Sequence, residues 1–304
     1  MGVLRDAPPL PSQGNAKNYV RILTDTTRLS EGGLCEMWKR LASLLLGWYE
    51  QLQQEALLSA VLHADETGWR VNGQTHWLWC FTNNQLTFYQ IDKSRGSPAL
   101  QKFFTEEFTG TLITDFFSAY HAVDAGDKQK CWAHLLRELD APKAPTKDDW
   151  QRFGRRVRRL FKDACTLRVE RDALDEPAYE DRIFRLEGRA LRLAQEDWES
   201  PDARRLAKRI GKHAGELFTF LWHDDVDPTN NHAEREVRPA VQIRKNSYQN
   251  ASPSGAHTQA VLMTVLRTLK RRGSNPLHAL TEAVKNYAAI GRLPEIPAAV
   301  ASGG

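Results

Sequence analysis

Val61-Leu62-His63-Ala64-Asp65 and Gly110-Thr111-Leu112-Ile113-Thr114-Asp115 are two similar stretches that indicate the fold class of this chain. Each is a short run with β-strand character whose last residue is a carboxylate. Helical patterns separate such strands along the chain, as in an α/β core. Because side chains at such strand ends converge at one rim of a sheet, we expect Asp65 and Asp115 to lie close together.

The sequence around these strands predicts further elements of both kinds. Two β-rich runs, Thr75 to Thr82 and Leu86 to Ile91, are separated by a short turn and predict a hairpin. Lys130 to His134 predicts another short strand. Helices are predicted at Leu34 to Glu55, Pro98 to Phe104, from about Asn231, His257 to Arg272 and Pro276 to Ile290.

A long segment from Asp148 to Trp222 consists almost entirely of helix formers and carries no strand signal. It predicts a helical insertion whose first helix presents Arg155, Arg156 and Arg159 on one face. Such a basic face is most often simply solvated, and contact with DNA is the alternative. The predicted parts are a lead-in and helical segment (1–58), a core in two pieces (59–141 and 227–290), the insertion (142–226) and a tail (291–304).

Composition excludes several classes of protein. The 304 residues are 41% hydrophobic and 26% charged, and the longest apolar stretch, near Leu41 to Trp48, is too short to span a bilayer. The first residues hold no apolar signal region, which predicts a cytoplasmic protein with no membrane partner. A net charge of +4 is compatible with nucleic acid. The four cysteines form no Cys-x-x-Cys set, so neither a zinc knuckle nor a disulfide framework is predicted.

Two strand-end acids that converge have a clear chemical use. Two carboxylates at 4 Å repel each other by roughly 4 kcal/mol at an effective dielectric of about 20, so they persist best around a cation. Mg²⁺ prefers oxygen ligands, and a pair of such ions serves phosphoryl transfer. The residues alone leave the third acid open. Structural roles also stay open for the three acids: Asp65 as a turn residue, Asp115 as a helix cap, and Glu234 as part of a capping box with Asn231 as N-cap.

Several motifs resemble the insertion-sequence 66 family of bacterial transposases, and their order and spacing agree with it over roughly Val61 to Asn286. The motifs are His63-Ala64-Asp65-Glu66-Thr67, Thr114-Asp115-Phe116-Phe117-Ser118-Ala119-Tyr120, Cys131-Trp132-Ala133-His134, Asn230-Asn231-His232-Ala233-Glu234-Arg235 and the run from Val237 to Asn246.

The resemblance implies a ribonuclease-H-like mixed sheet flanked by helices, with an all-helical insertion before the last catalytic helix. It implies that Asp65, Asp115 and Glu234 are catalytic and hold Mg²⁺, for which Mn²⁺ can substitute. The implied activity is metal-dependent DNA strand cleavage and strand transfer by a homo-oligomer on DNA, with possible accessory proteins of the same element. The implied supporting residues are Trp132 and His134, and the implied DNA contacts are Arg235, Arg238, Arg244 and Lys245.

Two other functions stay open. One is a metal-dependent nuclease without strand transfer, and the other is a truncated or inactive derivative that only binds DNA or a partner. Members of the family usually carry an N-terminal zinc-binding and helix-turn-helix region, yet no Cys-x-x-Cys set lies ahead of Val61. We therefore expect DNA binding by this chain to be mainly electrostatic. Glu66 is left out of the site because its side chain should point to the face opposite Asp65.

Overall fold

The structure is a computed structural model that describes residues 30–140 and 148–299, so the predicted disordered lead-in through Asn15 lies outside the described residues. The elements, in chain order, are α2 (Glu31–Leu44), α3 (Leu46–Leu57), β1 (Val61–Val71), β2 (Gln74–Thr82), β3 (Thr87–Asp92), α4 (Ser97–Phe103), β4 (Phe108–Thr114), η1 (Ser118–Ala122), β5 (Ala125–Lys130), α5 (Trp132–Asp140), α6 (Asp148–Val169), η2 (Arg171–Ala173), α7 (Glu176–Gln195), α8 (Pro201–Lys212), α9 (Ala214–Leu217), α10 (Thr219–Trp222), α11 (Asn231–Ser247), α12 (Pro253–Arg271) and α13 (Pro276–Ile290).

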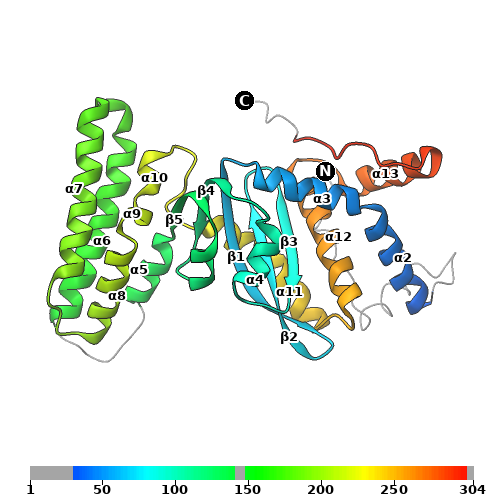
Figure 1. Cartoon of the computed structure of the whole chain (residues 1–304), viewed down its shortest axis with the longest axis horizontal. Coiled ribbons are helices and arrows are strands. Elements are labelled where there is room, and N and C mark those ends of the chain that lie inside the picture. Colours follow the sequence, from blue (N-terminus) through cyan, green and yellow to red (C-terminus); the bar gives the residue numbers. More distant parts are fainter. Residues whose placement is uncertain (1–29, 141–147, 300–304) are drawn as a thin grey trace, which may run out of the picture.

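One five-stranded mixed sheet in the order β3-β2-β1-β4-β5 forms the centre of the molecule (Figure 1). The strands β1, β2 and β3 are antiparallel neighbours, which confirms the predicted hairpin, whereas β4 is parallel to both β1 and β5. Helices cover the sheet, with α11 against β1 and β2 and with α12 against β3. The predicted mixed sheet flanked by helices is therefore confirmed.

Strand β1 is longer than the sequence indicated. We expected it to end at Asp65, but it continues to Val71, where Val71 pairs with Gln74 of β2. The hairpin partner supplies hydrogen bonds well beyond the carboxylate, so Asp65 lies within a central strand. A second expectation was also wrong: the strand predicted at Lys130 to His134 ends at Lys130, and α5 begins at Trp132.

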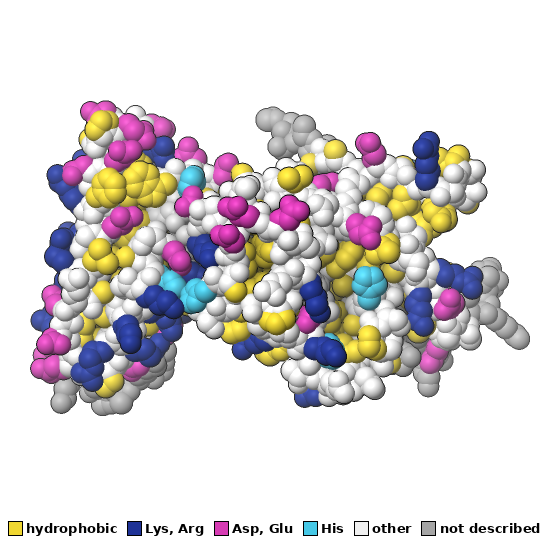
Figure 2. Space-filling model, in the orientation of Figure 1, with side chains coloured by type: hydrophobic (Ala, Val, Ile, Leu, Met, Phe, Trp, Pro, Cys, Tyr) yellow, Lys and Arg dark blue, Asp and Glu magenta, His cyan; other side chains and the backbone are white. Residues whose placement is uncertain are grey.

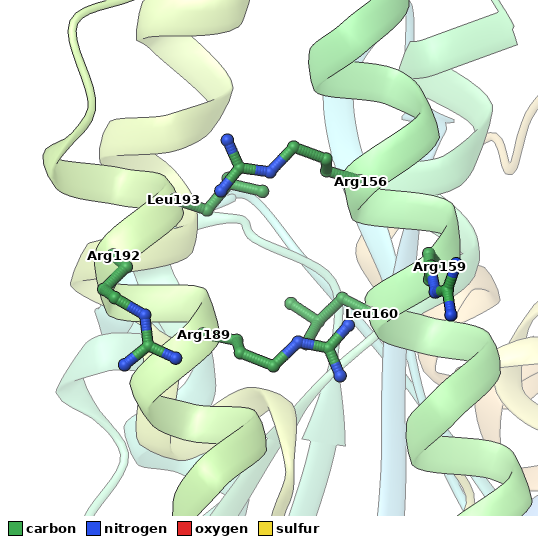
Figure 3. A pocket seen from close by; sticks show the side chains of 6 residues that line it. All are labelled: Arg156, Arg159, Leu160, Arg189, Arg192 and Leu193. Atoms are coloured by element: carbon green, nitrogen blue, oxygen red, sulfur yellow. The ribbon is translucent and has the colours of Figure 1, made fainter.

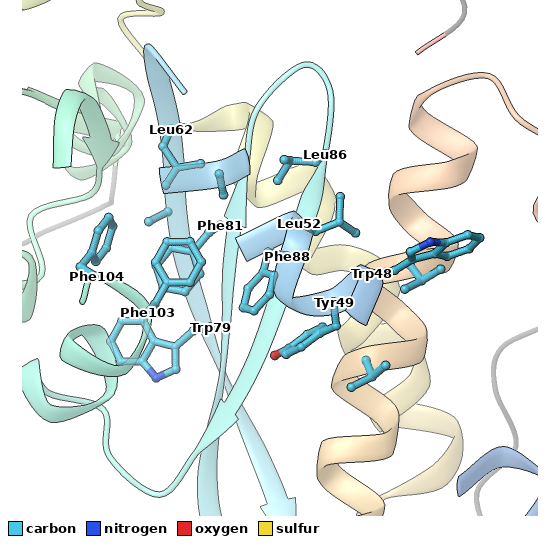
Figure 4. Close-up of a cluster of buried hydrophobic side chains, with 14 of the residues drawn as sticks. Trp48, Tyr49, Leu52, Leu62, Trp79, Phe81, Leu86, Phe88, Phe103 and Phe104 are labelled. Atoms are coloured by element: carbon cyan, nitrogen blue, oxygen red, sulfur yellow. The ribbon is translucent and has the colours of Figure 1, made fainter. Parts of the chain in front are cut away.

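A large aromatic core lies between one face of the sheet and helices α3 and α4 (Figure 4). The alternation of strand residues places Trp79 and Phe81 on this face, and both are fully buried. Phe81 stacks on Phe103 with 3.7 Å between ring centroids. This packing fixes the central strands and hence the side chains that emerge on their other face.

Helices α6 to α10 form a separate layer beside the β5 edge of the sheet (Figure 1). They have their own apolar core, which extends to Ile113 of β4 and Trp132 of α5. The Trp132 amide donates to the Pro228 carbonyl at 2.9 Å, so the chain enters and leaves this helical part at neighbouring points. The division of the chain into domains at the residues given above stays a prediction.

Lys and Arg side chains gather on the lower half of this helical part in Figure 2. None of the described helices is both long and apolar enough to cross a membrane.

Candidate active site

Pairing between β1 and β4 brings the first two candidate acids together. The parallel register sets Leu62 beside Leu112 and His63 beside Ile113. Continuing that register by two residues sets Asp65 beside Asp115, which directly follows the last residue of β4. Neighbouring strands lie about 4.8 Å apart, and residues directly opposite in a parallel pair point to the same face. The sheet therefore aims both carboxylates at one place.

The face on which Asp65 lies differs from that of its neighbour Glu66. Glu66 accepts a hydrogen bond from Tyr120 at 2.8 Å and pairs with Arg95 at 3.1 Å, within the aromatic side of the sheet. Asp65 lies on the opposite side, which α11 covers. The prediction that Glu66 points away from Asp65 agrees with these contacts.

Helix α11 brings Glu234 to the same side of the sheet. The helix begins at Asn231, and its N-cap is Asn230, whose side chain makes no capping bond. Glu234 is thus the fourth helical residue, and the capping box considered with Asn231 as N-cap is absent. Asp115 does have a local structural role: its Oδ1 accepts a hydrogen bond from the Phe117 backbone amide at 2.8 Å, just before η1 begins.

Asn230 joins α11 to the central strand and is a residue whose role the sequence reasoning missed. Its fully buried amide donates to the Ala64 carbonyl at 2.7 Å, and its Oδ1 lies 3.1 Å from His63 Nδ1. Its backbone amide donates to Cys131 Sγ at 3.0 Å. These bonds fix the start of α11 one residue from Asp65 on β1. The only signal in the sequence is an Asn directly before a helix, and the N-cap expected from it, Asn231, lies one position too late.

Replacing Asn230 by Ala should lower the free energy of unfolding by about 1–3 kcal/mol for each buried partner left unsatisfied, here the Ala64 carbonyl and His63. Urea unfolding measures the loss. The matched control is Asn231→Ala, which changes an exposed neighbour and should leave stability nearly unchanged. Equal stability of the two variants would contradict the structural role given to Asn230.

The charges of the other two candidate acids act on Asp65. Burial and then the charge of Glu66 raise the pKa of Asp65, with further contributions from Asp115 and Glu234, to about 7. The Glu66 backbone amide, which donates to Asp65 at 2.9 Å, opposes this rise. Helix α5 supplies Arg137, which forms an ion pair with Glu234, and His134, whose Nδ1 lies 3.7 Å from the same carboxylate.

The donor chemistry of these residues suits a divalent cation. A buried carboxyl whose pKa is raised by other carboxylates gains most from a positive charge placed among them. His134 Nδ1 is a buried nitrogen without a hydrogen-bond partner in the structure, and it adds a donor beside Glu234. The carboxylate oxygens of Asp65, Asp115 and Glu234 do not all lie within 4.8 Å of one another. Among the described residues, ligand atoms of Cys131, His134 and Glu234 do lie that close together. Burial raises the pKa of the Cys131 thiol, and a protonated thiol is a poor ligand.

The other predicted residues fall into two groups. Trp132 is fully buried and donates to the Leu217 carbonyl at 2.6 Å, so it holds α5 against the helical part and lies outside the acid cluster. Arg244 is tied to β1 through the Thr67 hydroxyl at 3.1 Å and the Gly68 carbonyl. The exposed basic side chains of α11 are those of Arg235, Arg238 and Lys245.

The three arginines predicted on α6 line two different pockets. Arg156 and Arg159 line a pocket toward α7, whereas Arg155 lines a different one with Trp150 and Arg158. Helical periodicity predicts which residues share a face of a helix, but it does not predict which other helices pack beside that face.

Lys130 ends β5 with a fully buried ammonium group next to the candidate site. Its Nζ donates to Thr114 Oγ1 at 2.9 Å and lies 4.0 Å from Glu216. Burial lowers the pKa of Lys130 to about 8, although the Glu216 carboxylate opposes the change. The charged groups around it are Glu216, Asp115, Lys128 and Lys212.

Replacing Lys130 by Met should raise the free energy of unfolding at neutral pH. The folded pKa of about 8 lies below the unfolded value, so the folded state is penalised in full below pH 8 and less as the pH rises. The gain should reach up to about 3 kcal/mol below pH 8 and vanish above about pH 10.5. Urea unfolding at several pH values measures it. A Met variant that is less stable at every pH would show that the bond to Thr114 outweighs the cost of burial.

The sheet order, the parallel β1–β4 pair and the helices on its faces define the ribonuclease-H-like class of mixed α/β folds. A family model described as "Transposase IS66 family" matches residues 15–258, and the chain belongs to this family. The chain is also 26% identical over 254 residues to an uncharacterized protein, y4qI, of Sinorhizobium fredii (strain NBRC 101917 / NGR234). That alignment covers 70% of this chain and 44% of the relative, so the chain spans less than half of the relative's length.

Proposed function

We propose that this chain is the catalytic part of a DNA transposase that cuts and rejoins the phosphodiester backbone of an insertion sequence. The observation that carries the proposal is the β1–β4 register, which sets Asp65 beside Asp115 on the face where α11 presents Glu234. Membership of the transposase family supports the same activity independently.

In this proposal Asp65, Asp115 and Glu234 hold Mg²⁺, and Mn²⁺ substitutes for it. When bound, the cation neutralises charge that builds on the phosphoryl oxygens and makes water a stronger nucleophile. The protein holds its acids on rigid elements, since Asp65 lies within a strand and Asn230 fixes α11 against that strand. His134 and Arg137 position the Glu234 carboxylate from α5.

The proposed reaction has two steps, a hydrolysis and a transesterification. Water attacks a backbone phosphorus, the bond to the 3′-oxygen breaks, and a 3′-hydroxyl is left at the element end. That hydroxyl then attacks a phosphorus of target DNA, so one phosphodiester bond forms as another breaks and the target releases its own 3′-hydroxyl. Neither step needs a covalent enzyme intermediate.

DNA is the proposed partner, bound through its phosphates near the acids. Arg235, Arg238 and Lys245 are exposed on the helix that carries Glu234, where their charges would hold the backbone. Because transposition joins two ends, we also propose an assembly of two or more copies on DNA, with accessory proteins of the same element as further partners.

The experiment that tests the function combines the chain with a supercoiled plasmid and a labelled duplex that already ends in a 3′-hydroxyl, in Mg²⁺, in Mn²⁺ and in a chelator. We expect metal-dependent nicking and transfer of label to the plasmid. Nicking without transfer would favour the nuclease alternative. Binding without either reaction, under both metals, would contradict the proposal and favour an inactive derivative.

A further inference from the structure

A pocket of about 100 Å³ lies between α6 and α7 in the helical part, away from the acid cluster (Figure 3). Arg156 and Arg159 of α6 and Arg189 and Arg192 of α7 line it, and Leu160 and Leu193 complete the lining. Figure 3 shows Arg156 and Arg189 reaching across the space between the two helices from opposite sides. Four arginines and two leucines thus line a small space, which the Arg156 and Arg189 side chains cross while those of Arg159 and Arg192 lie over their own helices (Figure 3).

The charges around this α6–α7 pocket do not cancel. Glu196 pairs with Arg156, and Asp163 serves both Arg189, at 2.7 Å, and Arg159, at 3.9 Å. Arg192 forms no ion pair with any residue that the structure describes. Four positive groups therefore share two carboxylates.

A neighbouring pocket along the same two helices shows the contrast. Arg182, Arg185 and Arg189 of α7 line it together with Asp163 and Glu170, and Arg189 borders both pockets. Each of these three arginines has a carboxylate partner. Arg182 pairs with Glu170 at 2.8 Å and Arg185 with Asp181 at 2.6 Å. An excess of arginine is therefore a property of the α6–α7 pocket and not of the whole helix pair.

We propose that the α6–α7 pocket binds a phosphate group of the DNA backbone. Guanidinium groups present planar pairs of donors that match phosphate oxygens, and an arginine without a carboxylate partner gains most from an anion. Contact at this pocket would carry no sequence information, because every nucleotide has the same phosphate. The choice of DNA as the source of the phosphate rests on the proposed function.

The test compares two double variants that remove the same charge. The pocket variant, Arg159→Gln with Arg192→Gln, removes the two arginines that have the weakest ion pairs in the α6–α7 pocket. The matched control, Arg182→Gln with Arg185→Gln, removes two arginines from the neighbouring pocket. Binding of a short labelled duplex is followed by fluorescence anisotropy over a series of salt concentrations. We expect the pocket variant to bind about tenfold more weakly and its slope of log K against log salt to fall by about 0.9 for each phosphate that the protein no longer binds. The control should match the wild type.

Equal affinity and slope in wild type and pocket variant would overturn the proposal, and so would equal losses in both double variants, which would show a diffuse charge effect. A wild type that never nicks, together with a selective loss of binding in the pocket variant, would keep this proposal and refute the proposed function. Circular dichroism of all proteins checks that the helices are intact.

Discussion

Replacing any one of Asp65, Asp115 or Glu234 by its amide should reduce metal-dependent nicking by about a thousandfold, the upper order of loss when one charge-stabilising group is removed from an active site. The amides keep the size of the side chain, but they remove the charge that a divalent cation needs. The measurement is the rate of nicking of supercoiled plasmid in Mg²⁺ and in Mn²⁺. DNA binding should survive, because the exposed arginines and lysines are unchanged.

The matched control for these three variants is Glu66→Gln. It makes the same chemical change one residue away, on the opposite face of β1, and Gln can keep the hydrogen bonds to Tyr120 and Arg95. This variant should nick at a rate close to that of the wild type. If Glu66→Gln abolished nicking while Asp65→Asn did not, the face assigned to the site would be wrong.

A large effect on stability is also expected at Glu236. This buried carboxylate accepts hydrogen bonds from Arg267 at 2.8 Å and from the Thr87 hydroxyl at 3.2 Å, and it pairs with Arg271 at 2.5 Å. Burial alone would raise the pKa of Glu236, but the two arginines overcome that effect and lower it. The cluster joins α11 to α12 and to β3, so it holds together three elements around the sheet.

Glu236→Gln should lower the free energy of unfolding by about 3–5 kcal/mol, because it leaves two guanidinium groups partly buried without a counter-charge. Guanidinium chloride would disturb this pair, so urea unfolding is the measurement. As the comparison, Glu36→Gln breaks an exposed ion pair with Arg40 and should cost less than about 0.5 kcal/mol. A loss at Glu236 no larger than that at Glu36 would show that the buried pair adds nothing to stability.

Local pattern was enough to predict much of the fold. The apolar runs before Asp65 and Asp115 and the turn between β2 and β3 indicated the sheet, because strand alternation and turn chemistry act over a few residues. The same alternation separated Asp65 from Glu66. Glu234 came from the family resemblance, since nothing local distinguishes that Glu from any other near a helix start.

What the sequence could not predict depends on distant partners. The length of β1 is set by β2, and the start of α5 by the Trp132 amide, which bonds to Pro228 far along the chain. The contact of Arg244 with DNA stays a prediction, and the sequence did not indicate that its Nη1 donates to the Thr67 hydroxyl and the Gly68 carbonyl, which are distant along the chain. Helical periodicity could not show that Arg192, on another helix, would share a pocket with Arg156 and Arg159.

The bond between Trp132 and Pro228 has a consequence for how such a chain can change over evolution. It closes the base of the helical part, so the chain returns to the sheet where it left. The entropy of closing a loop grows only slowly with its length, so residues could be added or removed beyond this point at little thermodynamic cost. Selection could therefore reshape the surface of the helical part while the distance between Asp115 and Glu234 stayed constant.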